Sequence, residues 1–164
     1  MTAAQSKPWM IAETVFGLPF LLGLAIQFAF PDILPRNAFR PWGVAVGMAF
    51  IVVGITIARA ARREFRGAMQ PTEPGQPTTR IVTSGVFSFS RNPLYLATVF
   101  ILVGAALALA LPWALVSVVP GMIACRYLLI GPEERYLAAK FPDEFRHYSA
   151  RVRRWIGRTG RGVP

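Results

Sequence analysis

The stretch between residues 80 and 95, RIVTSGVFSFSRNPLY, combines residue types that neither a membrane span nor a simple tether requires. Residues 83–85, Thr-Ser-Gly, favour a tight turn with free hydroxyl groups. Residues 91–93, Arg-Asn-Pro, bring a forked donor, an amide and a proline that suits the first turn of a helix. The backbone amides behind that proline form a partly positive end that can receive an anion or a carboxylate. We therefore expect a ligand to bind here.

A second group of ionisable residues lies near the end of the last apolar run. Glu133 and Glu134 follow Pro132, and Arg126 comes one to two turns before that run ends. Acids in the first turn of a helix complement its dipole, and carboxylates also accept hydrogen bonds from cationic or hydroxyl-bearing ligand groups. An arginine inside a span is costly unless it faces a polar cavity or extends toward the headgroups. For Arg126 both possibilities stay open. If it faces a polar cavity, it could steer an anionic head group.

Long apolar segments must position these residues. The chain is 54% hydrophobic and only 16% charged, a composition that excludes an ordinary soluble domain. About 20 apolar residues cross a hydrocarbon core of roughly 30 Å. The runs at 10–30 and 42–61 have this length, and those at 94–110 and 112–130 are slightly short. We predict an all-α integral membrane protein with four transmembrane helices in one domain, 1–164. The third and fourth helices form a tight hairpin because almost nothing separates them.

The net charge of +10 is concentrated in two regions, the polar loop at 59–91 and the tail at 131–164. Neither region carries a nucleic-acid recognition motif, so nucleic acid is not an expected partner, whereas basic residues mark cytoplasmic segments of membrane proteins. Four spans then place both termini and the loop at 78–95 in the cytoplasm, with the chain in a membrane of the bacterial inner-membrane type. The two groups of candidate residues consequently share one face. Cys125 is the single cysteine, which excludes an internal disulfide and a cysteine metal cluster, and we predict no metal site.

The tail is expected to contain short amphipathic helices. Pro132 suits the first turn of one helix, and Pro142 should divide the run into two. Apolar residues recur at helical spacing along this run, at Leu137, Phe141, Phe145 and Tyr148. We predict that this stripe lies at the membrane interface.

Three motifs in this order, a V-T-S-G-V-F turn, the R-N-P-L-Y start of a hairpin and the segment GPEERYLAAKFPDEFRHY, give the chain a family likeness. It resembles the isoprenylcysteine carboxyl methyltransferases, which are related to the phospholipid N-methyltransferases, and the likeness covers roughly residues 78–156. Asn92 stands where many members have histidine, which puts any role of an imidazole in doubt, and Phe87 replaces a frequent tyrosine. The basic residue that eukaryotic members carry before the acidic pair has no obvious equivalent. Leu129 lies near that point, and Arg126 is a candidate substitute.

The resemblance implies a membrane-embedded enzyme that uses S-adenosylmethionine. Carried over by motif, the expected cofactor contacts are Arg80, Ile81, Val82, Thr83, Phe87, Asn92, Pro93, Leu94, Tyr95 and Glu133. Glu134 and Arg126 are the expected catalytic residues, with Arg126 near an anionic group of the acceptor. Methyl transfer is an in-line displacement, so the protein chiefly aligns the reactants and excludes water.

The expected acceptor is a lipophilic molecule in the bilayer, first of all an isoprenylcysteine-like carboxylate. A lipid amine of the phosphatidylethanolamine type is the alternative acceptor. An NADPH-dependent membrane reductase and a non-catalytic membrane scaffold are the alternative functions. Membrane lipids are the expected partners, and nothing in the sequence indicates an oligomer. The acceptor itself is not identified by the sequence, because pockets for lipidic substrates are lined by ordinary apolar side chains.

Overall fold

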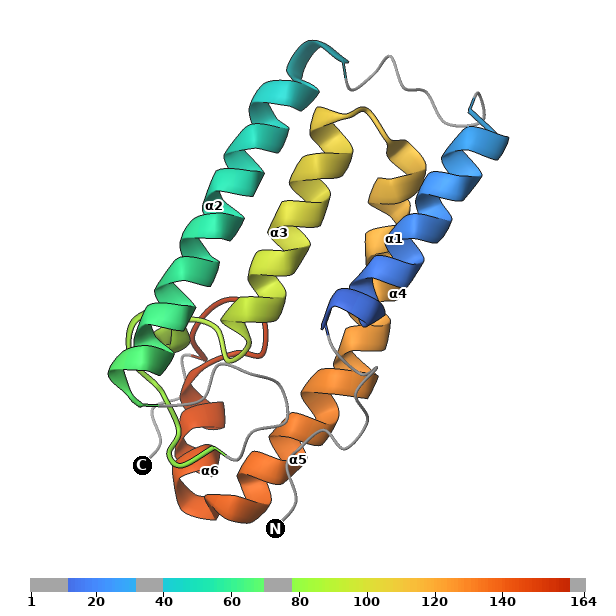
Figure 1. The fold of residues 1–164 in the computed structure, drawn as a ribbon. Helices are drawn as coiled ribbons and strands as arrows, with labels where there is room; N and C mark the ends of the chain where they lie inside the picture. Colours follow the sequence, from blue (N-terminus) through green and yellow to red (C-terminus); the bar gives the residue numbers. More distant parts are fainter. Residues whose placement is uncertain (1–11, 32–39, 70–77, 160–164) are drawn as a thin grey trace.

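The computed structural model describes residues 12–31, 40–69 and 78–159, and within them it is helical without a β-strand. Of the six α-helices in these residues, the first four run side by side and the last two lie below them (Figure 1). These helices are α1 (Ala12–Ala29), α2 (Arg40–Gly67), α3 (Pro93–Ala108), α4 (Pro112–Cys125), α5 (Gly131–Lys140) and α6 (Pro142–Arg151). A 3-10 turn, η2 (Gly85–Ser88), precedes α3, and a π-helical turn, η3 (Arg126–Ile130), joins α4 to α5. The prediction of an all-α protein is confirmed for these residues.

The bundle is built mainly from two helix pairs, α2 with α3 and α1 with α4, and α3 and α4 form the predicted hairpin between them (Figure 1). Small residues let the paired backbones approach closely. A Cβ atom on Gly47 would lie 2.5 Å from the carbonyl oxygen of Gly104, and a Cβ atom on Gly23 would lie 2.7 Å from Oγ of Ser117. Neither position has room for a side chain. Helix pairs in lipid gain contact area in this way.

Among the described residues, three helices are long and apolar enough to cross a membrane. They are Ala12–Ala29, Pro41–Gly67 and Pro112–Lys140. The remaining apolar helix, α3, has 16 residues and is therefore about 24 Å long, which is shorter than a typical hydrocarbon core. An integral membrane protein is thus supported, whereas the predicted count of four spans stays a prediction.

Two helices are longer than the sequence indicated. Helix α2 continues to Gly67, through arginines of the predicted polar loop, because Arg, Ala and Glu all favour helix. The helix that contains the last predicted span continues past 130, since α4, η3 and α5 form one continuous helix, Pro112–Lys140. Within η3 the backbone hydrogen bonds span five residues instead of four, and the Gly131 amide donates to the carbonyl of Arg126, five residues earlier. This wider turn precedes Pro132, which has no amide hydrogen to give to the helix.

The tail packs against the protein's own loop, which corrects the predicted interfacial stripe. Pro142 does divide the run, as predicted, since α5 ends at Lys140 and α6 begins at Pro142. However, Tyr148 and Phe145 lie in a cluster with Phe87 and the end of α2. The Tyr148 hydroxyl donates to the Phe87 carbonyl over 2.8 Å, and burial raises the pKa of Tyr148 so that this donor stays protonated. The residues at 81–88 thus supply a second core, which covers part of the predicted stripe.

The hairpin between α3 and α4 contains a non-glycine residue in the left-handed conformation, Ala110, with φ of 50°. Its amide donates to Leu107, and the next amide donates to Ala106, the hydrogen bonds of a Schellman cap that favours glycine. We predict that Ala110→Gly stabilises the protein by about 1 kcal/mol, because it removes the steric cost of this conformation. The melting temperature in detergent should rise by about 2 to 4 °C. Ala105→Gly, inside α3, is the control and should lower it; a fall with Ala110→Gly would contradict the cap.

Candidate functional site

The first turn of α3 meets the beginning of α5 at the lower end of the bundle. The Tyr95 hydroxyl donates to Oε2 of Glu133 over 3.3 Å. Tyr95 is in the first turn of α3 because Pro93 begins that helix, and Glu133 follows η3 in the continuous helix. This bond brings the two sequence motifs together across 38 residues of chain. The structure therefore places both groups of candidate residues at one end of the molecule.

The neighbourhood of this contact is mainly apolar. Tyr95 and Trp155 pack against a cluster whose buried members include Cys125 and Leu129, both at 0% exposure. In the described part of the chain, Glu133 Oε2 has the Tyr95 hydroxyl as its partner and Oε1 accepts no hydrogen bond. A carboxylate with one oxygen available beside an apolar wall can accept hydrogen bonds from hydroxyl or ammonium groups of a ligand.

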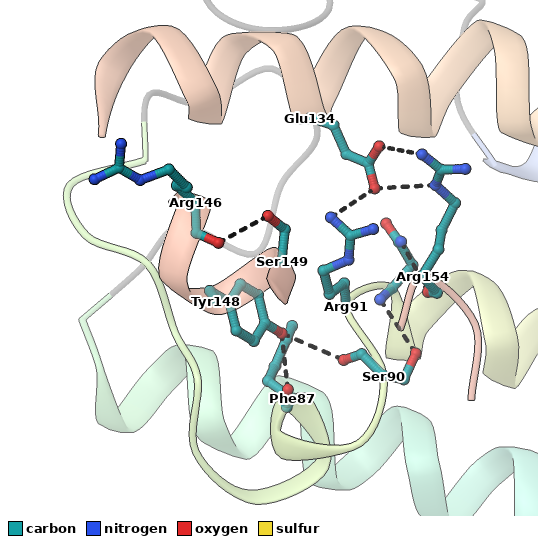
Figure 2. A network of polar contacts seen from close by, with 9 residues as sticks. Phe87, Ser90, Arg91, Glu134, Arg146, Tyr148, Ser149 and Arg154 are labelled. Atoms are coloured by element: carbon teal, nitrogen blue, oxygen red, sulfur yellow. Dashed lines mark hydrogen bonds and ion pairs between the residues drawn. The ribbon is translucent and has the colours of Figure 1, made fainter. Parts of the chain in front are cut away.

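Glu134, the next residue, is engaged by two arginines (Figure 2). Arg154 binds it through two nitrogens, Nε at 3.0 Å and Nη2 at 2.6 Å, and Nη1 of Arg91 lies 3.3 Å from Oε1. Hydrogen bonds to Glu134 raise the pKa of Arg154, whereas burial lowers the pKa of Arg91 although Glu134 opposes that change. Arginine is protonated at physiological pH, so two cations share one carboxylate.

Residues 152–159, which we call the C-terminal strap, run beside the loop that leads into α3. The Arg91 amide donates to the carbonyl of Arg153 over 3.1 Å, and the Gly157 amide donates to the carbonyl of Phe89 over 2.8 Å. The side-chain amide of Asn92 donates to the carbonyl of Arg154 over 3.0 Å. The strap turns at Gly157, whose φ of +106° suits glycine. This segment was not predicted from the sequence, which shows only arginines and a tryptophan in a basic tail.

The remaining candidates lie in varied environments. Phe87 is 5% exposed with its ring centroid 4.9 Å from that of Phe65, and Pro93 is fully buried, so their side chains serve the core. Ile81, Val82 and Leu94 pack partly buried against the same cluster as Phe87. Arg80 and Thr83 are exposed.

Arg126 lies on η3 and is exposed, with its guanidinium carbon 5.6 Å from the ring centroid of the neighbouring Tyr127. Tyr127 is itself 67% exposed. The side chain of Arg126 thus lies on the outside of the bundle, at the beginning of the π-helical turn. Among the described residues, no group of three His, Cys, Asp or Glu side chains could hold a metal ion.

Comparison with known proteins finds a matching protein family. The family model described as phospholipid methyltransferase matches residues 42–144, from α2 into α6, and this range contains both Tyr95 and Glu133. A protein of Haemophilus influenzae, described as uncharacterized, is 36% identical over 63 residues. That alignment covers 38% of this chain and the whole of the Haemophilus protein.

Proposed function

Because the chain belongs to the phospholipid methyltransferase family, we propose that it transfers a methyl group from S-adenosylmethionine to an acceptor in the lipid bilayer. The contact between Tyr95 and Glu133 is the observation that carries this proposal. It joins two of the three motifs of the family likeness at one end of three helices that are apolar enough to cross a membrane.

The residues present fit such a cofactor in their chemistry. S-adenosylmethionine carries ribose hydroxyls and an ammonium group, which are donors for the available oxygen of Glu133. Tyr95 would hold the Glu133 carboxylate in place, and the first amides of α3 would receive the cofactor's carboxylate. Only the backbone of Asn92 would serve this helix start, because its side-chain amide binds the C-terminal strap. The cofactor, when bound, supplies an already activated methyl group on a sulfonium.

The protein's own contribution is alignment and the exclusion of water. The apolar wall around Leu129 and Trp155 limits water beside the Glu133 carboxylate. A lipidic acceptor would reach this end of the bundle sideways from the bilayer. Arg126, exposed on η3, is placed on the outside where an anionic acceptor group would arrive. Glu134 would serve the reaction by holding two arginines, not by moving a proton.

Two acceptor classes remain. An isoprenylcysteine-like carboxylate is the first, since an exposed arginine on η3 suits an anion. A lipid amine of the phosphatidylethanolamine type is the second, and the description of the matching family favours it. The two products differ chemically, because a methyl ester is hydrolysed by base and an N-methyl amine is not.

The test is methyl transfer by the full chain in lipid nanodiscs, with S-adenosylmethionine labelled on its methyl group. Farnesylcysteine-type acceptors and phosphatidylethanolamine are supplied in separate reactions. We expect label in one of the two lipid products, with base treatment releasing it only from the ester. Failure to label either acceptor, together with binding or oxidation of NADPH, would favour a reductase instead. Failure to label either acceptor and to bind either cofactor would favour a scaffold.

A further inference from the structure

We propose that Arg154 is a positioning residue for this reaction, because it ties the beginning of α3 to the beginning of α5 and so sets the distance at which Tyr95 meets Glu133. The inference rests on the proposed function. It concerns a residue in the C-terminal strap, beyond residues 42–144 that the family model matches.

The side chain of Arg154 holds α5. Its two bonds to Glu134, at 3.0 and 2.6 Å, use both carboxylate oxygens, a forked geometry that fixes direction as well as distance. Glu134 directly follows Glu133 in the helix, so fixing one carboxylate restricts the backbone that carries the other.

The main chain of Arg154 holds α3. Its carbonyl accepts the side-chain amide of Asn92, whose own carbonyl accepts the Leu96 amide in the first turn of α3. Tyr95 stands in that same turn. A single residue therefore contacts both elements whose side chains meet at the candidate site. Figure 2 shows its contact with Glu134. The neighbouring bonds from Arg91 and Gly157 keep the strap beside the loop.

The environment of Arg154 separates it from the other arginines of the tail. Its side chain is 32% exposed and paired, while Arg151 and Arg153, which precede it in the chain, are exposed residues. A simple headgroup anchor would extend outward, as those neighbours do. Arg91 reaches Glu134 at 3.3 Å through one nitrogen only, so it does not replace the fork of Arg154.

The experiment compares Arg154→Ala, Arg154→Lys and Arg153→Ala in the full chain in nanodiscs. The readouts are the KM for S-adenosylmethionine and kcat with the acceptor that the wild type methylates, and the Kd for S-adenosylhomocysteine by calorimetry. We expect Arg154→Ala to raise KM and Kd about tenfold while kcat changes less than about threefold, because cofactor binding needs both helix starts in place. Lysine offers a single point charge, so Arg154→Lys should recover only part of the affinity. Arg153→Ala, which removes the same charge from the adjacent position, should match the wild type.

Wild-type KM and Kd in Arg154→Ala would overturn the inference and show an ion pair without consequence for the site. Should Arg154→Ala not fold, Arg154→Lys decides: raised KM with a wild-type melting temperature supports positioning, and an unchanged KM overturns it. Equal losses in Arg153→Ala and Arg154→Ala would also overturn it, in favour of general tail charge. A wild type that neither binds S-adenosylhomocysteine nor transfers a methyl group is a different result, which removes the proposed function and this inference with it.

Discussion

Replacing Glu133 with glutamine is expected to lower kcat/KM for methyl transfer by about 10- to 100-fold. The amide has the same size and can still accept the Tyr95 hydroxyl, but it lacks the charge that strengthens hydrogen bonds to cofactor hydroxyl or ammonium groups. Hydrogen bonds to charged groups contribute about 1.5–3 kcal/mol, and each 1.4 kcal/mol corresponds to a factor of ten. Initial rates with labelled S-adenosylmethionine in nanodiscs measure the effect.

The matched control for this change is Glu144→Gln, an acid of α6 that is exposed. It removes the same charge from the same end of the molecule and should leave the rate unchanged. Tyr95→Phe should give a smaller loss than Glu133→Gln, because it frees the carboxylate without neutralising it. A Glu133→Gln protein that transfers methyl groups at the wild-type rate would exclude Glu133 from the site.

Replacing Glu134 with alanine is expected to destabilise the fold by about 3 kcal/mol, because it leaves two partly buried cations without their shared carboxylate. The side chains of Arg91 and Glu134 are only 14% and 17% exposed, so water cannot replace the missing partner fully. For a chain of this length the melting temperature should fall by about 6 to 12 °C, measured by thermal unfolding in detergent.

The chain offers a control for Glu134 in the ion pair between Asp143 and Arg146, which spans 2.9 Å with side chains 79% and 74% exposed. Exposed pairs contribute about 0–1 kcal/mol, so Asp143→Ala should hardly change the melting temperature. Equal melting temperatures in the two variants would contradict the structural role of Glu134. Such a result, with methyl transfer lost only in Glu134→Ala, would return Glu134 to the catalytic role that the sequence indicated.

The features that depended on local pattern were predictable from the sequence. Apolar runs of membrane-spanning length predicted the helices, and Pro142 divides the tail where expected. Charge clustering correctly grouped the acids at 133–134 with the motif at 80–95, because both lie at ends of apolar runs on the arginine-rich side. Tyr95 and Glu133 accordingly meet in the structure.

The features that depended on long-range packing were not predictable. Tyr148 and Phe145 had the spacing of an interfacial stripe, and periodicity alone does not tell which surface covers such a face. The strap was invisible because much of its attachment uses backbone groups, such as the carbonyls of Arg153 and Arg154, which carry no sequence signature. Pro132 suggested a helix start, whereas the π-helical turn before it let one helix continue.

Calorimetric titration of the full chain with S-adenosylhomocysteine tests most directly whether the meeting point of α3 and α5 binds a nucleoside cofactor. We predict saturable binding to the wild type, binding weakened at least about tenfold in Glu133→Gln, and no heat from NADPH. Equal affinity in both proteins would place the cofactor elsewhere, and heat from NADPH alone would identify a different class of enzyme.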